Sequence, residues 1–209
     1  MATVRHDGPA NTGRPLIGMQ SPLPERRWFV VLWIIANIIG FLIGSVLGAT
    51  NDGLVSRLMS GSIAPRIIGD LLFGASFGVA QWLVLGRFFP QSRPGLIWWI
   101  PACMLGFMIG ARLGARFAPL VSEDTFLVGI AFGALMGLSL STVQCITLWL
   151  SGTLKTVRPL LWILVSIVAW IIGESIAFHF EFVLLGVPIV ALAIALVSGI
   201  ALLWWIKPA

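Results

Sequence analysis

Two stretches of the chain carry nearly the same ten residues, GFLIGSVLGA at 40–49 and GFMIGARLGA at 106–115. Seven of the ten letters agree, and glycine recurs at every fourth position in both stretches. Residues four apart in an α-helix lie on one face, so each stretch predicts a helix with a groove of small residues along one side. One of the mismatches places Arg112 inside an apolar run, where a charge needs a partner.

The composition indicates an integral membrane protein. Of the 209 residues, 58% are hydrophobic and only 10% are charged, and the mean hydropathy is +1.01. Soluble proteins carry about 25% charged residues, and a fold of this size in water could not bury so much apolar surface. The net charge of +5 comes from basic residues scattered between apolar runs, so no basic patch favours nucleic acid as a partner.

Six apolar runs are long enough to cross a hydrocarbon core of about 30 Å as helices. The predicted spans are approximately 28–50, 67–89, 96–117, 126–150, 160–180 and 183–206. Trp28, Trp98 and Trp99 lie near predicted ends, where indole rings favour the interface between lipid and water. We therefore expect an all-α integral membrane protein with one six-helix transmembrane domain, 28–206.

The segment before the first span and the distribution of charge predict the orientation. Residues 1–27 are polar and rich in proline and glycine, which is typical of a flexible tail. With this tail in the cytoplasm, nine lysines and arginines fall on the cytoplasmic side and four on the other, which also receives six of the eight acids. The positive-inside rule then favours cytoplasmic N- and C-termini in a multi-pass protein of the cytoplasmic (inner) membrane.

The repeated segment extends to a third copy. A shift of 66 residues superposes Trp33 on Trp99, and a further shift of 63 reaches Trp162. The same shifts bring the spaced glycines of the first two copies onto Ala169, Gly173 and Ala177. The first, third and fifth spans are therefore predicted to be copies of one unit.

The returning spans match more weakly. A shift of 63 aligns Gly74 with Gly137 and Gln81 with Gln144, whereas the sixth span offers only small residues such as Ala191 as an echo. The pattern predicts three helical hairpins in tandem, with an approximate pseudo-threefold repeat about an axis along the membrane normal.

The spaced glycines have two interpretations. In lipid, small residues let helix backbones approach closely, so the simpler interpretation is packing between helices. The other interpretation is a groove that accepts a lipid tail, an isoprenoid or a pigment. The predicted helix-packing residues are Gly40, Gly44, Gly48, Gly106, Gly110, Gly114, Gly173, Gly74, Gly78, Gly133 and Gly137.

Two neighbouring spans carry a motif that resembles a known group of membrane proteins. The segment GASFGVAQWLVL at 74–85 precedes a helix in which Trp99, Ala102, Gly106 and Gly110 follow one another at helical spacing. This arrangement resembles uncharacterised bacterial multi-span membrane proteins built from repeated hairpins of the form G-x-x-x-G-x-x-Q-W-L-x-L. The resemblance covers most of residues 28–180, although Cys145 replaces the tryptophan in the second hairpin. It implies the fold and brings no known activity.

Arg112 and Glu174 are the predicted intramembrane ion pair. The repeat alignment places Glu174 opposite Ala111, so the two charges lie at similar depth in the third and fifth spans. An unpaired charge at the centre of a span costs about 2.5–3.5 kcal/mol, and pairing offsets that cost. We expect the pair to fix the bundle and not to carry chemistry, because nothing around it resembles a proton relay.

The other polar residues of the spans predict contacts between helices. Gln81 and Gln144 occupy equivalent repeat positions, and with Asn37 they are expected to hydrogen-bond across helices or to contact a ligand. Asp70 is expected to complement the N-terminus of the second helix. His179, the only histidine of the spans, is a possible ligand contact, although a histidine at a helix end is more often interfacial.

The sequence predicts no enzyme. It holds no metalloprotease, serine-hydrolase, P-loop or paired-cysteine motif, and it requires no metal or cofactor. We expect an accessory or scaffold subunit of a larger membrane complex, such as a photosynthetic or respiratory one, with grooves for lipid, quinone or pigment. Membrane lipids and other membrane subunits are the expected partners. The alternative is a small transporter or substrate-binding membrane subunit for an apolar or lipid-like solute, with Pro101 and Pro188 as candidate helix breaks.

Overall fold

The computed structural model describes residues 23–49, 64–90, 93–150, 159–180 and 183–205, and every element in these ranges is a helix. The prediction of an all-α fold is therefore confirmed. In chain order the elements are α1 (Leu23–Gly44), η1 (Ser45–Ala49), α3 (Ala64–Phe88), α4 (Arg93–Leu96), α5 (Trp99–Phe117), η3 (Ala118–Leu120), α6 (Thr125–Leu150), α7 (Pro159–Phe180) and α8 (Val183–Trp205).

Five of the long helices are long and apolar enough to cross a membrane. These candidate spans are Arg27–Gly48, Arg66–Phe88, Pro94–Leu120, Thr125–Thr147 and Leu160–His179. In α8 the apolar stretch is the shorter Gly186–Leu202. The chain is therefore a membrane protein, as predicted, while a sixth crossing stays a prediction.

The first long helix begins a few residues before the end of the predicted tail. Helix α1 begins at Leu23, so residues 23–27 of the predicted tail are helical, and residues 1–22 lie outside the described part of the chain. Pro24 occupies the first turn of α1, where a missing N–H removes no helical hydrogen bond. Pro24 is therefore compatible with the start of α1.

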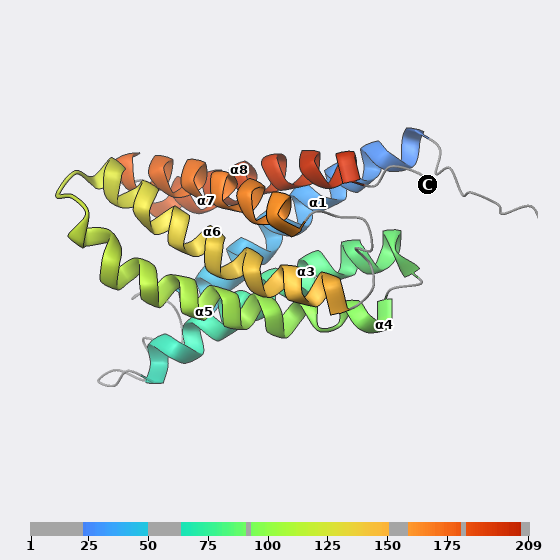
Figure 1. Ribbon diagram of the computed structural model, residues 1–209, viewed down its shortest axis with the longest axis horizontal. Helices are drawn as coiled ribbons and strands as arrows, with labels where there is room; N and C mark the ends of the chain where they lie inside the picture. The colour runs from blue at the N-terminus through green and yellow to red at the C-terminus, as the bar shows by residue number, and fades with distance from the viewer. Residues whose placement is uncertain (1–22, 50–63, 91–92, 151–158, 181–182, 206–209) are drawn as a thin grey trace, which may run out of the picture.

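The six long helices form a closed ring in chain order. Each of α1, α3, α5, α6 and α7 packs against the long helix that follows it, and α8 packs against α1. Figure 1 shows α8 along one edge of the bundle, with α1 starting near the C-terminal end of α8 and running obliquely away from it. Below, α1, α5 and α7 are called the forward helices, and α3, α6 and α8 the return helices. The ring brings the first and last long helices, α1 and α8, into one interface.

The spaced glycines lie where one helix meets the next. A Cβ atom added at Gly106 of α5 would lie 2.7 Å from the Cα atom of Leu140 in α6, and one added at Gly133 of α6 would lie 2.7 Å from the Cα atom of Ile171 in α7. The glycines of α1 meet α3 in the same way, those of α3 meet α5, and Gly173 of α7 meets Val190 of α8. The glycine faces are therefore covered by neighbouring helices.

The closest approach of two helices lies between η1 and α3. An added Cβ at Gly69 would collide with the carbonyl oxygen of Gly48, and one at Gly48 would lie 2.6 Å from the Cα atom of Gly69. No side chain fits between these backbones, so glycine is required on both sides.

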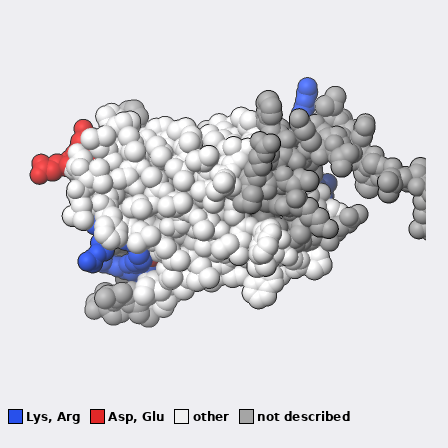
Figure 2. Space-filling model, in the orientation of Figure 1, with Lys and Arg blue, Asp and Glu red and all other residues white. Residues whose placement is uncertain are grey.

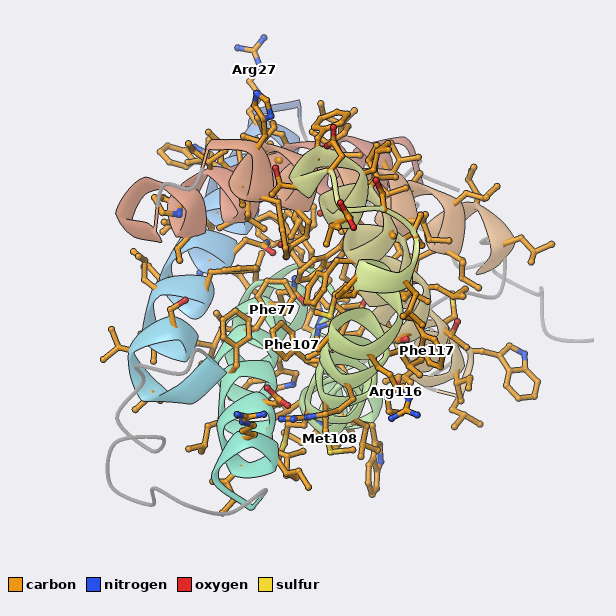
Figure 3. All side chains as sticks on the ribbon, turned by 90° about the vertical axis from the view of Figure 1, so that its left-hand side faces the viewer. Arg27, Phe77, Phe107, Met108, Arg116 and Phe117 are labelled. Carbon is orange, nitrogen blue, oxygen red and sulfur yellow. The ribbon has the colours of Figure 1, made fainter. Side chains whose placement is uncertain are left out.

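An aromatic layer fills the middle of the ring. Trp170 of α7 packs against Phe41 of α1 and Phe107 of α5, with ring centroids 5.7 and 6.2 Å apart. Phe73 of α3 stacks on Phe107 at 4.0 Å and meets Phe41 edge-on at 4.8 Å. All four side chains are buried. Figure 3, which looks along the bundle, places Phe107 in the interior between the helices.

Charged residues lie at the two ends of the bundle. In Figure 2 the visible face carries acidic and basic side chains at one end and basic side chains at the other, with an uncharged band between them. Large apolar side chains such as Leu83, Leu164 and Ile200 are exposed on the outer surface. An uncharged belt with exposed apolar side chains is the surface that hydrocarbon solvates.

Gly133→Ala tests the close packing. The new methyl group would lie 2.5 Å from the carbonyl oxygen of Trp170, so the helices must separate, and we expect a loss of about 1–3 kcal/mol in the free energy of unfolding. Thermal unfolding of the purified protein in mild detergent measures the effect.

Gly186→Ala is the matched control. An added Cβ there meets only the Cβ atom of Ala177 at an ordinary 3.7 Å, and alanine favours a helix by about 1 kcal/mol over glycine. This variant should unfold at or above the wild-type temperature. Equal losses for the two variants would contradict the packing described above.

Candidate functional site

A buried polar network surrounds the axis in the half of the bundle where α5 and α7 begin. Trp99 at the start of α5 donates its indole N–H to the Oε1 atom of Gln81 in α3, at 2.9 Å. Trp162 near the start of α7 donates in the same way to the Oε1 atom of Gln144 in α6, at 3.2 Å. Each return helix is thus bonded to the forward helix that follows it. The sequence assigned Trp99 to the lipid interface, but its side chain is buried.

The same glutamines also reach the forward helix that precedes them. Gln81 donates from Nε2 to the Oδ1 atom of Asn37 in α1, at 2.9 Å. Gln144 donates from Nε2 to the Sγ atom of Cys103 in α5, at 3.4 Å, and Cys103 lies 3.8 Å from Gln81 Oε1. Each glutamine therefore connects two forward helices that lie on either side of its own helix.

The last return helix closes the network. The indole N–H of Trp33 in α1 donates to the hydroxyl oxygen of Ser198 in α8 at 3.0 Å, across 165 residues of chain. Ser198 in turn donates to the carbonyl oxygen of Ile194 in its own helix. The first and last helices are thus joined by the same kind of bond as α3 and α5 and as α6 and α7.

The members of the network occupy equivalent positions under the shifts found in the sequence. The forward helices contribute Trp33, Trp99 and Trp162, and one turn further Asn37, Cys103 and Ser166. A further turn along, the same shifts superpose Phe41, Phe107 and Trp170 of the aromatic layer. The return helices contribute Gln81 and Gln144, which the shift of 63 relates. Ser198 of α8, 54 residues after Gln144, takes the corresponding place through its bond to Trp33.

The sequence did not predict that Cys103 and Ser198 are hydrogen-bond partners, or that Ser166 lines the cavity beside them. A signal for them existed, because a polar residue follows each repeated tryptophan after four positions, on the same helix face. Ser198 was harder to find, because the sixth helix replaces glutamine by serine and glycines by Ala191 and Ala195.

A small cavity lies inside the network. It is lined by side chains of five of the six long helices: Trp33, Phe77, Gln81, Leu140, Gln144, Trp162, Ser166, Ala169, Trp170, Ile194 and Ser198. The space open to the centre of a water molecule is about 10 Å³. This is room for about one water and excludes a larger solute in this conformation.

Arg112 forms its ion pair with Asp70 and not with Glu174. Its guanidinium NH2 group bonds to the Oδ2 atom of Asp70 in α3. Asp70 is buried with 7% of its side chain exposed, whereas Arg112 is 38% exposed. Because Asp70 lies six residues inside α3, it does not complement the start of that helix as expected. Both sequence assignments are corrected by this pair.

The geometry of α3 and α5 explains the choice of partner. Gly78 faces Ile100 and Gly74 faces Met104, so Asp70 lies one turn further along, level with Met108. A long side chain on a helix points back toward the N-terminus, which brings the head group of Arg112 to this level. Glu174 lies in α7, and α6 separates α7 from α5 in the ring. The similar depth of Arg112 and Glu174 in the membrane was therefore not enough to identify the partner of Arg112.

The remaining predicted site residue lies at the surface. His179, near the end of α7, is exposed and meets the ring of Phe126 edge-on, with centroids 5.9 Å apart. In the described part of the chain no three His, Cys, Asp or Glu side chains come together as metal ligands.

Comparison of the chain with known protein families, with characterised proteins and with solved structures finds no match. The resemblance to hairpin-repeat membrane proteins therefore stays a prediction based on the motifs themselves.

A double-mutant cycle tests the ion pair. Asp70→Asn and Arg112→Gln should each lower the stability in detergent, and the double variant should lose less than the sum of the two. Because Arg112 is partly exposed, we expect a coupling of about 1 kcal/mol. Glu174→Gln combined with Arg112→Gln is the control and should be additive. Coupling of Arg112 to Glu174 with none to Asp70 would restore the pair that the sequence suggested.

Proposed function

We propose that the protein is a non-enzymatic, six-span protein of the cytoplasmic membrane that serves as an accessory or scaffold subunit of a larger membrane complex. In this proposal α8 is the sixth crossing, the chain is three tandem hairpins related by a pseudo-threefold axis, and both termini face the cytoplasm. The filled interior of the helix ring is the observation that carries the proposal.

The repeat is supported by contacts at equivalent positions. Trp33, Trp99 and Trp162 each donate an indole N–H to a polar residue of a return helix. The ring passes from α8 back to α1 through such a bond. In a tandem repeat whose last unit packs on its first, each long helix has a neighbouring helix on both sides.

The residues that the structure describes leave no open channel for a solute along the axis of the bundle. The aromatic layer around Trp170 crosses the axis, and the cavity beside it holds about one water molecule. Helices α5 and α8 run through Pro101 and Pro188, so neither proline breaks its helix. Transporters of polar solutes usually have broken helices and polar clusters near the midplane. The geometry therefore favours packing over transport.

The glycine faces do not serve as grooves for a lipid, quinone or pigment in this arrangement. Each face receives the next helix, and even one added Cβ would meet backbone atoms at Gly74 or Gly137. A bound lipid or pigment would lie on the outer surface. That surface is apolar, and at the end with the polar network it exposes Trp28, Trp98 and Trp149. Such a surface can contact both lipid and neighbouring membrane subunits.

The proposal is tested by the state of the protein in its native membrane. We would cross-link intact membranes, solubilise them in mild detergent, and weigh the particle that contains this chain by native mass spectrometry, with a visible spectrum of the same sample. The expected result is a particle heavier than the 22.6 kDa chain that contains a second membrane protein at fixed stoichiometry.

A different outcome would favour transport. A particle that contains only this chain, alone or as a homo-oligomer, and whose unfolding temperature rises with one added apolar solute would contradict the subunit proposal, because a ligand that binds the native state stabilises it.

A further inference from the structure

Each return helix forms one link of the polar network through Gln81, Gln144 or Ser198. The three links differ in the number of forward helices to which they bond. Gln81 and Gln144 each bond to the forward helices on both sides of their own helix. Ser198 occupies the equivalent position in α8 and bonds to Trp33 of α1. In the part of the chain that the structure describes, it forms no hydrogen bond to the forward helix on its other side, α7.

Ser166 is the residue that the third link leaves without a partner. It occupies the position of Asn37 and Cys103, each of which bonds to a glutamine of the neighbouring return helix. The Ser166 side chain is 6% exposed, and among the residues that the structure describes none hydrogen-bonds to its hydroxyl group. A hydroxyl group inside a protein without a hydrogen-bond partner lowers the stability, so protein interiors usually provide one.

The cavity lies where that partner is needed. Ser166 and Ser198 both line it, together with the amide side chains of Gln81 and Gln144. Its volume of about 10 Å³ is at the lower end of the roughly 10–15 Å³ that one water molecule requires, and its lining supplies the two to four polar groups that hold a buried water.

We propose that one buried water molecule occupies this cavity and bridges Ser166 of α7 to Ser198 of α8. The water does for the third link what the longer side chains of Gln81 and Gln144 do for the first two. It makes the polar ring continuous through all three hairpins.

The hydrogen-bond inventory of the two serines accommodates this water. A hydroxyl group has one donor and two acceptor positions. Ser198 uses its donor on Ile194 and one acceptor position on Trp33, so one acceptor position remains for a water hydrogen. Ser166 has its donor and both acceptor positions available. The water can therefore donate to Ser198, accept from Ser166, and use its remaining positions on the glutamine amides.

The direct test is a map of the detergent-purified protein that resolves ordered water elsewhere in the molecule. We expect one rounded peak within hydrogen-bonding distance of both the Ser166 and the Ser198 hydroxyl oxygens. An empty site in such a map, or an elongated density from a lipid or another solute, would overturn the proposal.

Ser166→Ala gives a second test whose sign distinguishes a wet cavity from a dry one. If the water is present, alanine removes one of its partners, and the unfolding temperature should fall by about 2–4 °C. If the cavity is dry, alanine removes an unsatisfied hydroxyl group, and the temperature should stay the same or rise, which would overturn the proposal.

Ser175→Ala is the control for Ser166→Ala. Ser175 lies in the same helix and is equally buried, and its hydroxyl donates to the carbonyl oxygen of Ile172 in its own helix at 3.2 Å. Loss of that local bond should change the unfolding temperature less than loss of the bridge. A loss at Ser175 equal to or larger than the loss at Ser166 would contradict a bridging water.

Discussion

Helices in a bilayer gain nothing from leaving lipid for one another unless their backbones come close, because lipid tails are as apolar as leucine. This protein meets that constraint by presenting small residues to the next helix at every interface of its ring. Where Gly133 meets Ile171 or Gly106 meets Leu140, no Cβ atom fits between the backbones. Dispersion and short interhelical hydrogen bonds then become available, and every other feature of the bundle follows from this close approach.

The polar network depends on the close approach of the helix backbones, and its hydrogen bonds select one arrangement of the helices. A buried indole N–H needs an acceptor, and inside lipid only another helix can supply one. The three tryptophans of the forward helices find theirs on the three return helices. Such bonds contribute only about 0.6 kcal/mol each on average, but they are directional, so they fix the rotation and register of helices that glycine packing alone would leave free to slide. The aromatic layer then fills the space that remains on the axis.

The sequence predicted the helices of this arrangement, whereas the tandem repeat stays a prediction. The spacing of glycine and tryptophan predicted the helices and which positions are equivalent, because helical periodicity and composition are local properties. The partner of Arg112 could not be predicted from local sequence patterns. It depended on the antiparallel register of α3 against α5 and on the backward reach of a long side chain, and equal depth in the membrane could not choose between Asp70 and Glu174. Ser198 was missed for the opposite reason, since its role is conserved in geometry while its residue type is not the repeated glutamine.

The fold depends on closure of the ring between the first and last helices. A double-mutant cycle across that interface tests this closure most directly. Trp33→Phe removes the indole donor and Ser198→Ala removes its acceptor, 165 residues away in the chain. If α8 packs on α1 as described, unfolding in mild detergent should give a coupling of about 0.6–1.7 kcal/mol between the two changes. Strictly additive losses would mean that the two helices do not meet at this bond and that the ring is open.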